Sequence, residues 1–364
     1  DYNTTAYQSS TSNLFQVNIQ GGKETQLTSD GIDYASADFS SDGRFLIAAG
    51  SENGNKLYSI NRLFRFSWPS MSAKTELASK LDRPMNDFKI VGFDIWASIE
   101  DQGVDRIIKI SIASGEINPI LGGQMGSFSA VSPAIGGNFA FTYQHLGAPP
   151  EVFSFIGGQQ IPISKCNDNV LSTLDIPRPE VIWTVTSRGK KVRSFVLKPA
   201  GFDASKKYPL FVMLHGGPAS SFKDIFGYRW NAHIYGAPGY VVVMTDYTGS
   251  VGYGEKFAQD IQFDPFKGPA QEILEAATDA IKRFPYIDAT RQAAGGASYG
   301  GHLANWLQAS TTHFKCLIAH AGLVNSEVQW GTSDVIWGRE LMNGGAPWVP
   351  TKTWKEQNPM RFAA

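Results

Sequence analysis

Four short and almost uninterrupted apolar segments after residue 207 constrain the fold more than any other feature of the chain. They are YPLFVMLHGG, YVVVMTDY, QAAGGAS and FKCLIAHAG. Such runs are typical of strands buried on both faces, as in parallel sheets covered by helices. Between them, residues 269–284 place apolar side chains on one helical face, and Pro285 ends that helix. Alternation of strand and helix predicts an α/β domain with a mostly parallel sheet over residues 208–364.

The first half of the chain has a different pattern, with short strands broken by Gly, Asp, Asn and Ser and almost no helical periodicity. Apolar strands followed by Gly-rich turns begin about 45 residues apart, which is the period of four-stranded propeller blades. These strands start at Leu14, Leu57, Ile107 and Val152. A β-sandwich with accidental spacing is the alternative, but partner strands such as FSSDGRFLIAAG and VSPAIGGNFAFTY recur in the same order.

Roughly three to four blades fit into residues 1–170, fewer than a closed ring usually contains. We therefore predict partial β-propeller blades there and a second, α/β-hydrolase domain over residues 208–364 that lacks its C-terminal part. Residues 171–207 are predicted as a linker and hairpin, because Pro177 and Pro179 interrupt the chain and VRSFVLKP follows a turn. A chain of 364 residues is also longer than one compact core usually fills.

Composition and charge exclude several classes of partner. The chain has 32 Lys and Arg against 33 Asp and Glu, without a basic cluster, so we predict neither nucleic acid nor a membrane as a partner. Its longest apolar runs are strand-sized, and no transmembrane helix is predicted. Cys166 and Cys316 lie in segments assigned to different domains, so we expect two separate buried thiols rather than a disulfide. No cofactor or metal motif is present: there is no H-E-x-x-H, and the glycines of residues 295–301 surround a serine rather than a phosphate.

The stretch Gly296-Ala297-Ser298-Tyr299-Gly300 fits the pattern G-x-S-x-G and joins a predicted strand to a predicted helix. A serine hydroxyl is a poor nucleophile unless a tight turn exposes it and a base accepts its proton. The strand-to-helix setting supplies such a turn. We therefore predict that Ser298 is a catalytic nucleophile, the alternative being a purely structural turn.

The sequence His215-Gly216-Gly217-Pro218 follows another strand at the carboxyl edge of the sheet, where α/β folds place their chemistry. Glycines there let a backbone N–H point at a developing oxyanion, and the N–H of Tyr299 would be the second donor. The alternative is a tight loop that uses glycine only for its conformation. His215 itself is interpreted as a residue that shapes this loop.

Five segments together, HGGP, YRWN, GSVGYGEKF, GGASYGGHLANW and FKCLIAHAG, resemble the prolyl oligopeptidase family of serine peptidases. The branch of dipeptidyl and acylaminoacyl peptidases is the most similar. The resemblance covers nearly the whole chain and is strongest over residues 205–325. It implies a propeller followed by a hydrolase domain, Ser298 as the nucleophile, and the backbone N–H groups of Gly217 and Tyr299 as oxyanion donors.

The resemblance also implies cleavage of short peptides near their N-terminus, with the propeller limiting access to the site. A peptide is then the expected partner, a homodimer is left open, and a periplasmic or secreted location is expected, with a cytoplasmic one as the alternative. Two positions depart from the family pattern. Thr248 replaces an arginine before Gly-Ser, and His302 replaces an aromatic residue. The first departure raises the question of what supports the loop after Thr248.

The acid and base of a catalytic triad are harder to identify. In α/β-hydrolases the order along the chain is Ser, then Asp or Glu, then His. The candidates after the nucleophile are His302, His313, His320 and Asp334. None fits that order: His320 is expected to line the site or to be a satisfied core residue, and Asp334 to be a helix cap or surface residue. We therefore expect the triad Asp and His beyond Ala364, in a longer protein.

Three functions are consistent with these features of the sequence. The first is a serine exopeptidase, either dipeptidyl peptidase-like or an acylaminoacyl peptidase. The second is an esterase on the same sheet, and the third is a propeller binding module fused to an inactive hydrolase domain. A carboxylate pair such as Glu100-Asp101 would suit a free peptide amine, but we interpret this pair as part of a solvated turn.

Overall fold

The computed structural model describes residues 11–54 and 56–363. These residues form two units. One contains the described residues up to Tyr143 together with Glu151–Ser164, and the other contains Gln144–Pro150 and the described residues from Lys165 onward.

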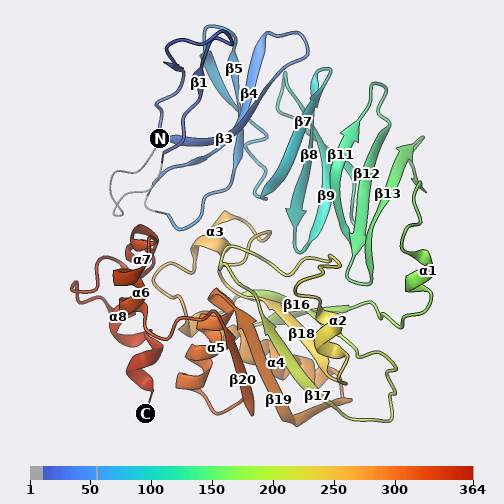
Figure 1. The fold of residues 1–364 in the computed structure, drawn as a ribbon, viewed down its shortest axis with the longest axis vertical. Helices are drawn as coiled ribbons and strands as arrows, with labels where there is room; N and C mark the ends of the chain where they lie inside the picture. Colours follow the sequence, from blue (N-terminus) through green and yellow to red (C-terminus); the bar gives the residue numbers. More distant parts are fainter. Residues whose placement is uncertain (1–10, 55, 364) are drawn as a thin grey trace. The chain divides into compact units, whose positions relative to one another are not determined.

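The first unit is built from antiparallel strands in chain order (Figure 1). A two-stranded sheet contains β1 (Phe15–Gln16) and β2 (Thr25–Gln26). The next sheet contains β3 (Ile32–Phe39), β4 (Phe45–Glu52), β5 (Arg62–Ser67) and β6 (Ser72–Leu77). It is followed by β7 (Met85–Val91), β8 (Asp94–Asp101), β9 (Val104–Ser111) and β10 (Ile117–Leu121). The last sheet contains β11 (Ser127–Pro133), β12 (Phe139–His145), β13 (Ala148–Ile156) and β14 (Gln159–Pro162), and the end of its β12–β13 hairpin, Gln144–Pro150, is counted with the second unit. Each of the last three sheets pairs its four strands in sequence order.

Alternating side chains bind these sheets together. Ile95 of β8 is fully buried in a cluster with Ile47 of β4, whereas the next residue, Trp96, is buried in a cluster with Phe128 and Phe139. Successive side chains of a strand point to opposite faces. The middle sheet is therefore covered on both faces, which explains why the interior of β8 is buried without interruption.

Two expectations for individual residues of the chain are wrong. Glu100-Asp101 does not lie in a solvated turn, because both residues belong to β8; Glu100 is buried and Asp101 pairs with Arg83 and Arg106 at 2.6 and 2.7 Å. The two cysteines are free, as expected, but both are exposed. Cys316 is the first residue of a strand at the edge of its sheet, where burial is incomplete.

The second unit contains a six-stranded sheet in the order β15-β16-β18-β17-β19-β20. Its strands are β15 (Glu180–Val185), β16 (Lys191–Leu197), β17 (Tyr208–Leu214), β18 (Val241–Asp246), β19 (Ile287–Ala297) and β20 (Cys316–His320). The last four are mutually parallel, as the apolar segments predict, whereas β16 pairs antiparallel with both β15 and β18. The hairpin within the predicted linker region, residues 171–207, thus supplies two strands of the sheet, because the backbone of β16 hydrogen-bonds to β18.

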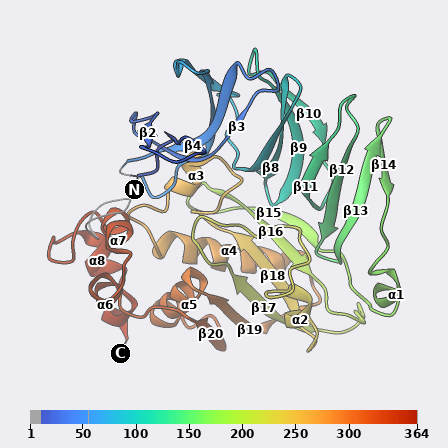
Figure 2. The ribbon, with the colours of Figure 1, turned by 45° about the horizontal axis from the view of Figure 1, so that its top comes forward.

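Helices pack along this sheet, as Figure 2 shows for α4 and α5. The long helices are α4 (Lys267–Arg283) and α5 (Tyr299–Ser310). Shorter ones are α1 (Asp168–Leu171), α2 (Ala232–Gly236), α3 (Glu255–Gln259), α6 (Ser326–Thr332), α7 (Ile336–Asn343), α8 (Lys352–Glu356) and the 3-10 helix η1 (Pro359–Phe362). Within the described residues, no helix combines the length and the apolar character needed to span a membrane.

Two apolar residues in the sheet of the second unit should contribute very differently to the free energy of unfolding. Leu210 of β17 is fully buried, whereas Val185 of β15 is 75% exposed. We expect Leu210→Ala to lower the free energy of unfolding by about 2–5 kcal/mol, because it removes buried methyl groups and leaves a cavity. Val185→Ala should change it by less than about 0.5 kcal/mol. Urea denaturation monitored by circular dichroism would measure both, and equal losses would contradict this account of the core.

Candidate functional site

Ser298 occupies the single residue between β19 and α5. Its backbone has φ +56° and ψ −122°, a conformation that non-glycine residues rarely adopt. The Ser298 N–H donates to the carbonyl of His320 at 3.0 Å, and the Ser298 carbonyl accepts from the N–H of His302 at 2.9 Å. The strand-to-helix setting predicted for this serine is therefore confirmed, and its strained turn is locked from both sides.

Three glycines around Ser298 let neighbouring backbone approach this turn. A β carbon at Gly296 or at Gly300 would overlap the carbonyl oxygen of Leu214, the last residue of β17. A β carbon at Gly301 would lie 2.6 Å from the carbonyl oxygen of His320. The G-x-S-x-G spacing thus reflects close packing of the ends of β17 and β20 against the turn.

Residues 215–220, here called the HGGP turn, follow β17 and lie beside the serine. A β carbon added to Gly216 would lie 3.5 Å from Ser298 Cβ and 4.0 Å from its Oγ. Gly217 has φ +117°, and a β carbon there would be 2.8 Å from the Ala219 nitrogen, so the turn requires glycine at this position.

The predicted oxyanion donors are the backbone N–H groups of Gly217, in the HGGP turn, and of Tyr299, the residue that follows the serine. The N–H of Gly217 donates no hydrogen bond within the part of the chain that the structure describes. The N–H of Tyr299 lies in the first turn of α5, where N–H groups have no intrahelical acceptor. The Tyr299 side chain is buried, with its hydroxyl donating to the carbonyl of Pro265. The roles of Ser298, Gly217 and Tyr299 in catalysis stay predictions, and the chain brings all three to the same edge of the sheet.

The sequence candidates for the acid and base have other surroundings. His302 is buried in α5, and its Nδ1 accepts from the N–H of Leu323 at 3.0 Å. His313 Nε2 contacts the Gln292 side chain at 2.9 Å. Asp334 is exposed, between α6 and α7.

His320 ends β20, and its ring lies edge-on to Trp230 with 5.5 Å between centroids. Across residues 11–54 and 56–363, no histidine hydrogen-bonds the Ser298 hydroxyl. None of the three histidine candidates is therefore seen as a base acting on the serine.

A cavity of about 400 Å³ adjoins the serine turn. Gly296 and Ala297 of the serine turn line this cavity, and so does Gly216 of the HGGP turn. Its walls are mainly apolar and include Met213, Tyr235, Met244, Trp230 and Ile318. Such a surface suits an apolar side chain of a ligand.

The site includes supporting residues that the sequence analysis missed. Thr248 donates from its backbone N–H and its hydroxyl to Glu272 of α4, at 2.7 and 2.8 Å, and Arg188 pairs with the same carboxylate at 3.2 Å. Glu272 therefore supports the loop that contains Thr248, the residue that stands where the resembled family has arginine. One signal was available: Glu272 shares a helical face with Ala276 and Ala280, at spacings of about four residues, where a charged side chain is out of place.

Burial of His302 predicts an acid-dependent loss of stability. It lowers the pKa of this histidine to about 3, against an ordinary 6.5. Below pH 6.5 the unfolded chain therefore binds a proton that the folded chain does not, and the free energy of unfolding should fall by about 2 kcal/mol between pH 7 and pH 5 from this residue alone. His302→Gln keeps an acceptor for the Leu323 N–H and should remove the contribution of His302 to the pH dependence of the free energy of unfolding. Urea titrations at several pH values would test this, and an unchanged slope would contradict it.

Comparison with known protein families gives a match over the second unit. Residues 226–364 match the model of the Prolyl oligopeptidase family. The chain is 29% identical over 275 residues to dipeptidyl-peptidase 5 of Schizosaccharomyces pombe, an alignment covering 74% of this chain and 39% of that protein. It is 36% identical over 208 residues to dipeptidyl-peptidase 5 of Porphyromonas endodontalis, covering 56% of this chain and 30% of that protein.

Solved structures share the fold over almost the whole chain. An acylaminoacyl peptidase of Pyrococcus horikoshii superimposes with a TM-score of 0.82 and 19% identity, covering 94% of this chain and 53% of that one. A puromycin hydrolase gives a TM-score of 0.70 and 19% identity, covering 95% and 54%. The chain spans about half the length of these proteins and less than two fifths of the two curated relatives. The second unit thus matches the model of the prolyl oligopeptidase family, and the chain shares its fold with the acylaminoacyl peptidase and the puromycin hydrolase.

Proposed function

We propose that the protein is a serine peptidase that forms an acyl-enzyme on Ser298 and cleaves short peptides near their N-terminus. The observation that carries this proposal is the strained backbone of Ser298, φ +56° and ψ −122°, between a buried strand and a helix. Backbone strain of this kind is concentrated at functional sites, and a structural turn at this position could use a glycine. The family match supports the same conclusion.

The proposed reaction uses groups on both sides of the serine. Ser298 Oγ attacks the scissile carbonyl carbon while a base takes its proton, and the resulting oxyanion accepts hydrogen bonds from the N–H groups of Gly217 and Tyr299. The tetrahedral intermediate then expels the amine, which takes up a proton, and water hydrolyses the ester on Ser298. No residue of the described chain is assigned as the acid or base.

The relatives suggest two substrate classes. The curated relatives are named dipeptidyl-peptidase 5, which supports release of dipeptides from a free N-terminus. A solved structure with this fold is named acylaminoacyl peptidase, which supports release of an acylated residue as the second candidate. The apolar cavity beside the serine turn supports a substrate with an apolar side chain near the cleaved bond.

The three four-stranded sheets of the first unit are proposed to be blades of a partial β-propeller, since each pairs its strands in sequence order. A periplasmic or secreted location is likewise proposed, from the family resemblance alone.

Labelling with a fluorophosphonate tests the nucleophile. We expect the full-length natural protein to gain the mass of one adduct and Ser298→Ala to gain none, because only an activated serine reacts. Ser310→Ala is the matched control: this serine lies at the other end of α5, where its hydroxyl donates to Trp306, and labelling should be unchanged. Intact mass under denaturing conditions reads out all three. An unlabelled full-length protein would favour an inactive hydrolase domain instead.

Two matched substrates separate the peptidase alternatives. A dipeptidyl anilide with a free amine should be hydrolysed at least about tenfold faster than the same compound with an acetylated amine, since a lost charge-assisted contact costs at least that factor. The measured quantity is kcat/KM for each compound with the full-length protein. Preference for the acetylated compound would assign acylaminoacyl release, and turnover of esters alone would assign an esterase.

A further inference from the structure

The HGGP turn is held by a second loop, residues 247–251, here called the TGS loop. Tyr247 donates its hydroxyl hydrogen to the carbonyl of His215 at 2.5 Å, and the two rings stack with centroids 4.2 Å apart and planes 8° apart. The Ser250 hydroxyl lies 2.9 Å from His215 Nε2. The first residue of the HGGP turn is therefore fixed through both its backbone and its side chain.

The far end of the HGGP turn contacts the same loop. The Val251 N–H donates to the carbonyl of Ser220 at 3.0 Å. A β carbon at Gly249 would lie 3.2 Å from Pro218 Cβ, so the two loops touch directly at the middle of the turn. The turn that contains Gly217 is thus braced at its start, middle and end by the TGS loop.

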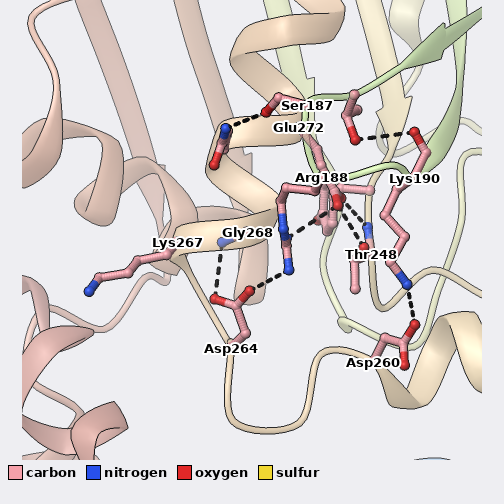
Figure 3. A network of polar contacts seen from close by, with 12 residues as sticks. Ser187, Arg188, Lys190, Thr248, Asp260, Asp264, Lys267, Gly268 and Glu272 are labelled. Carbon is pink, nitrogen blue, oxygen red and sulfur yellow. Dashed lines mark hydrogen bonds and ion pairs between the residues drawn. The ribbon is translucent and has the colours of Figure 1, made fainter.

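The TGS loop is in turn fixed by one buried carboxylate. Glu272 is fully buried, and its two oxygens accept from the Thr248 N–H at 2.7 Å and the Thr248 hydroxyl at 2.8 Å. One side chain of α4 thereby fixes both the backbone and the side chain of the loop. Figure 3 shows Thr248 and Glu272 joined in this way.

A cation keeps this carboxylate in place. Arg188 lies in the turn between β15 and β16 and donates to Glu272 at 3.2 Å and to Asp264 at 2.7 Å, while Asp264 accepts from the Gly268 N–H at 3.0 Å (Figure 3). An unpaired buried carboxylate would be costly. Burial raises the pKa of Glu272, whereas the two Thr248 hydrogen bonds and the Arg188 guanidinium favour its charged form.

We infer that Glu272, paired with Arg188, is a positioning residue for the oxyanion hole, because it fixes the TGS loop that braces the HGGP turn. The inference rests on the proposed serine-peptidase function. Donors stabilise an oxyanion only when they lie within a few tenths of an ångström of the right place, and removing one donor costs about 10²–10³ in kcat. Loosening the loop behind Gly217 should cost less, about tenfold, and should affect the transition state more than substrate binding.

The test compares two glutamates of α4 in the full-length protein. Glu272→Gln removes the charge that pairs with Arg188 and one acceptor for Thr248. Glu275→Gln is the matched control, because Glu275 also holds the β15–β16 turn, accepting from the Ser187 N–H and hydroxyl at 2.8 and 2.6 Å, but has no contact with Thr248. We expect Glu272→Gln to lower kcat and the fluorophosphonate labelling rate about tenfold with KM within about twofold, and Glu275→Gln to change neither.

Amide hydrogen exchange gives a readout that a general loss of stability would not reproduce. The Val251 N–H, which bonds Ser220, should exchange faster in Glu272→Gln, while amides in the centre of β18 keep their protection. Labelling of the wild-type protein separates the two proposals. An unlabelled wild type means that the proposed function fails, whereas a labelled wild type with Glu272→Gln at the same rate overturns the positioning role alone.

Thr248→Val provides a second variant should Glu272→Gln not fold. It keeps the Glu272–Arg188 pair and removes only the hydroxyl donor, so we expect kcat to fall about threefold with KM unchanged, the equivalent of one weakened hydrogen bond. Unchanged kcat in this folded variant would overturn the inference.

Discussion

The close approach of β17 to the serine turn is the constraint on which the rest of the site depends. The carbonyl oxygen of Leu214 fills the space where side chains at residues 296 and 300 would lie. Any side chain there would push the end of β17 away from the turn. The HGGP turn, which continues directly from Leu214, would move with it, and Gly216 would no longer lie beside Ser298. Glycine at these positions therefore places two segments, far apart in sequence, next to each other.

Two buried carboxylates stabilise the loops around this contact. Asp246, at the end of β18, accepts from the Phe222 N–H at 2.7 Å and pairs with Arg193 at 2.6 Å. Glu272 accepts two hydrogen bonds from Thr248, which lies two residues after Asp246 in the chain. The cations that compensate these charges, Arg188 and Arg193, both come from the β15–β16 hairpin. A segment that joins the two halves of the sequence is thus also the source of charge balance beneath the site, since buried carboxylates without partners would be strongly destabilising.

Two buried histidines near the site, His215 and His302, have supporting contacts and are not placed as a catalytic base. Burial lowers the pKa of His215 and of His302, so both are neutral near pH 7. His215 contacts Ser250 and Tyr247, and His302 contacts the backbone of Leu323. Their surroundings are those of residues that shape loops and helix packing.

The sequence by itself determined the strand-to-helix turn at Ser298, the parallel strands and the hairpin turns, because these depend on local periodicity and on where glycine is required. The exposed cysteines, the place of Glu100 in a strand, and the membership of β15 and β16 in the sheet were decided only by the tertiary structure. So was the link from Arg188 through Glu272 to Thr248, whose two contacts join residues 84 and 24 positions apart in the chain. Periodicity reports which face of an element is buried, but not which buried groups meet, and a buried charge acquires its partner only when distant elements pack together.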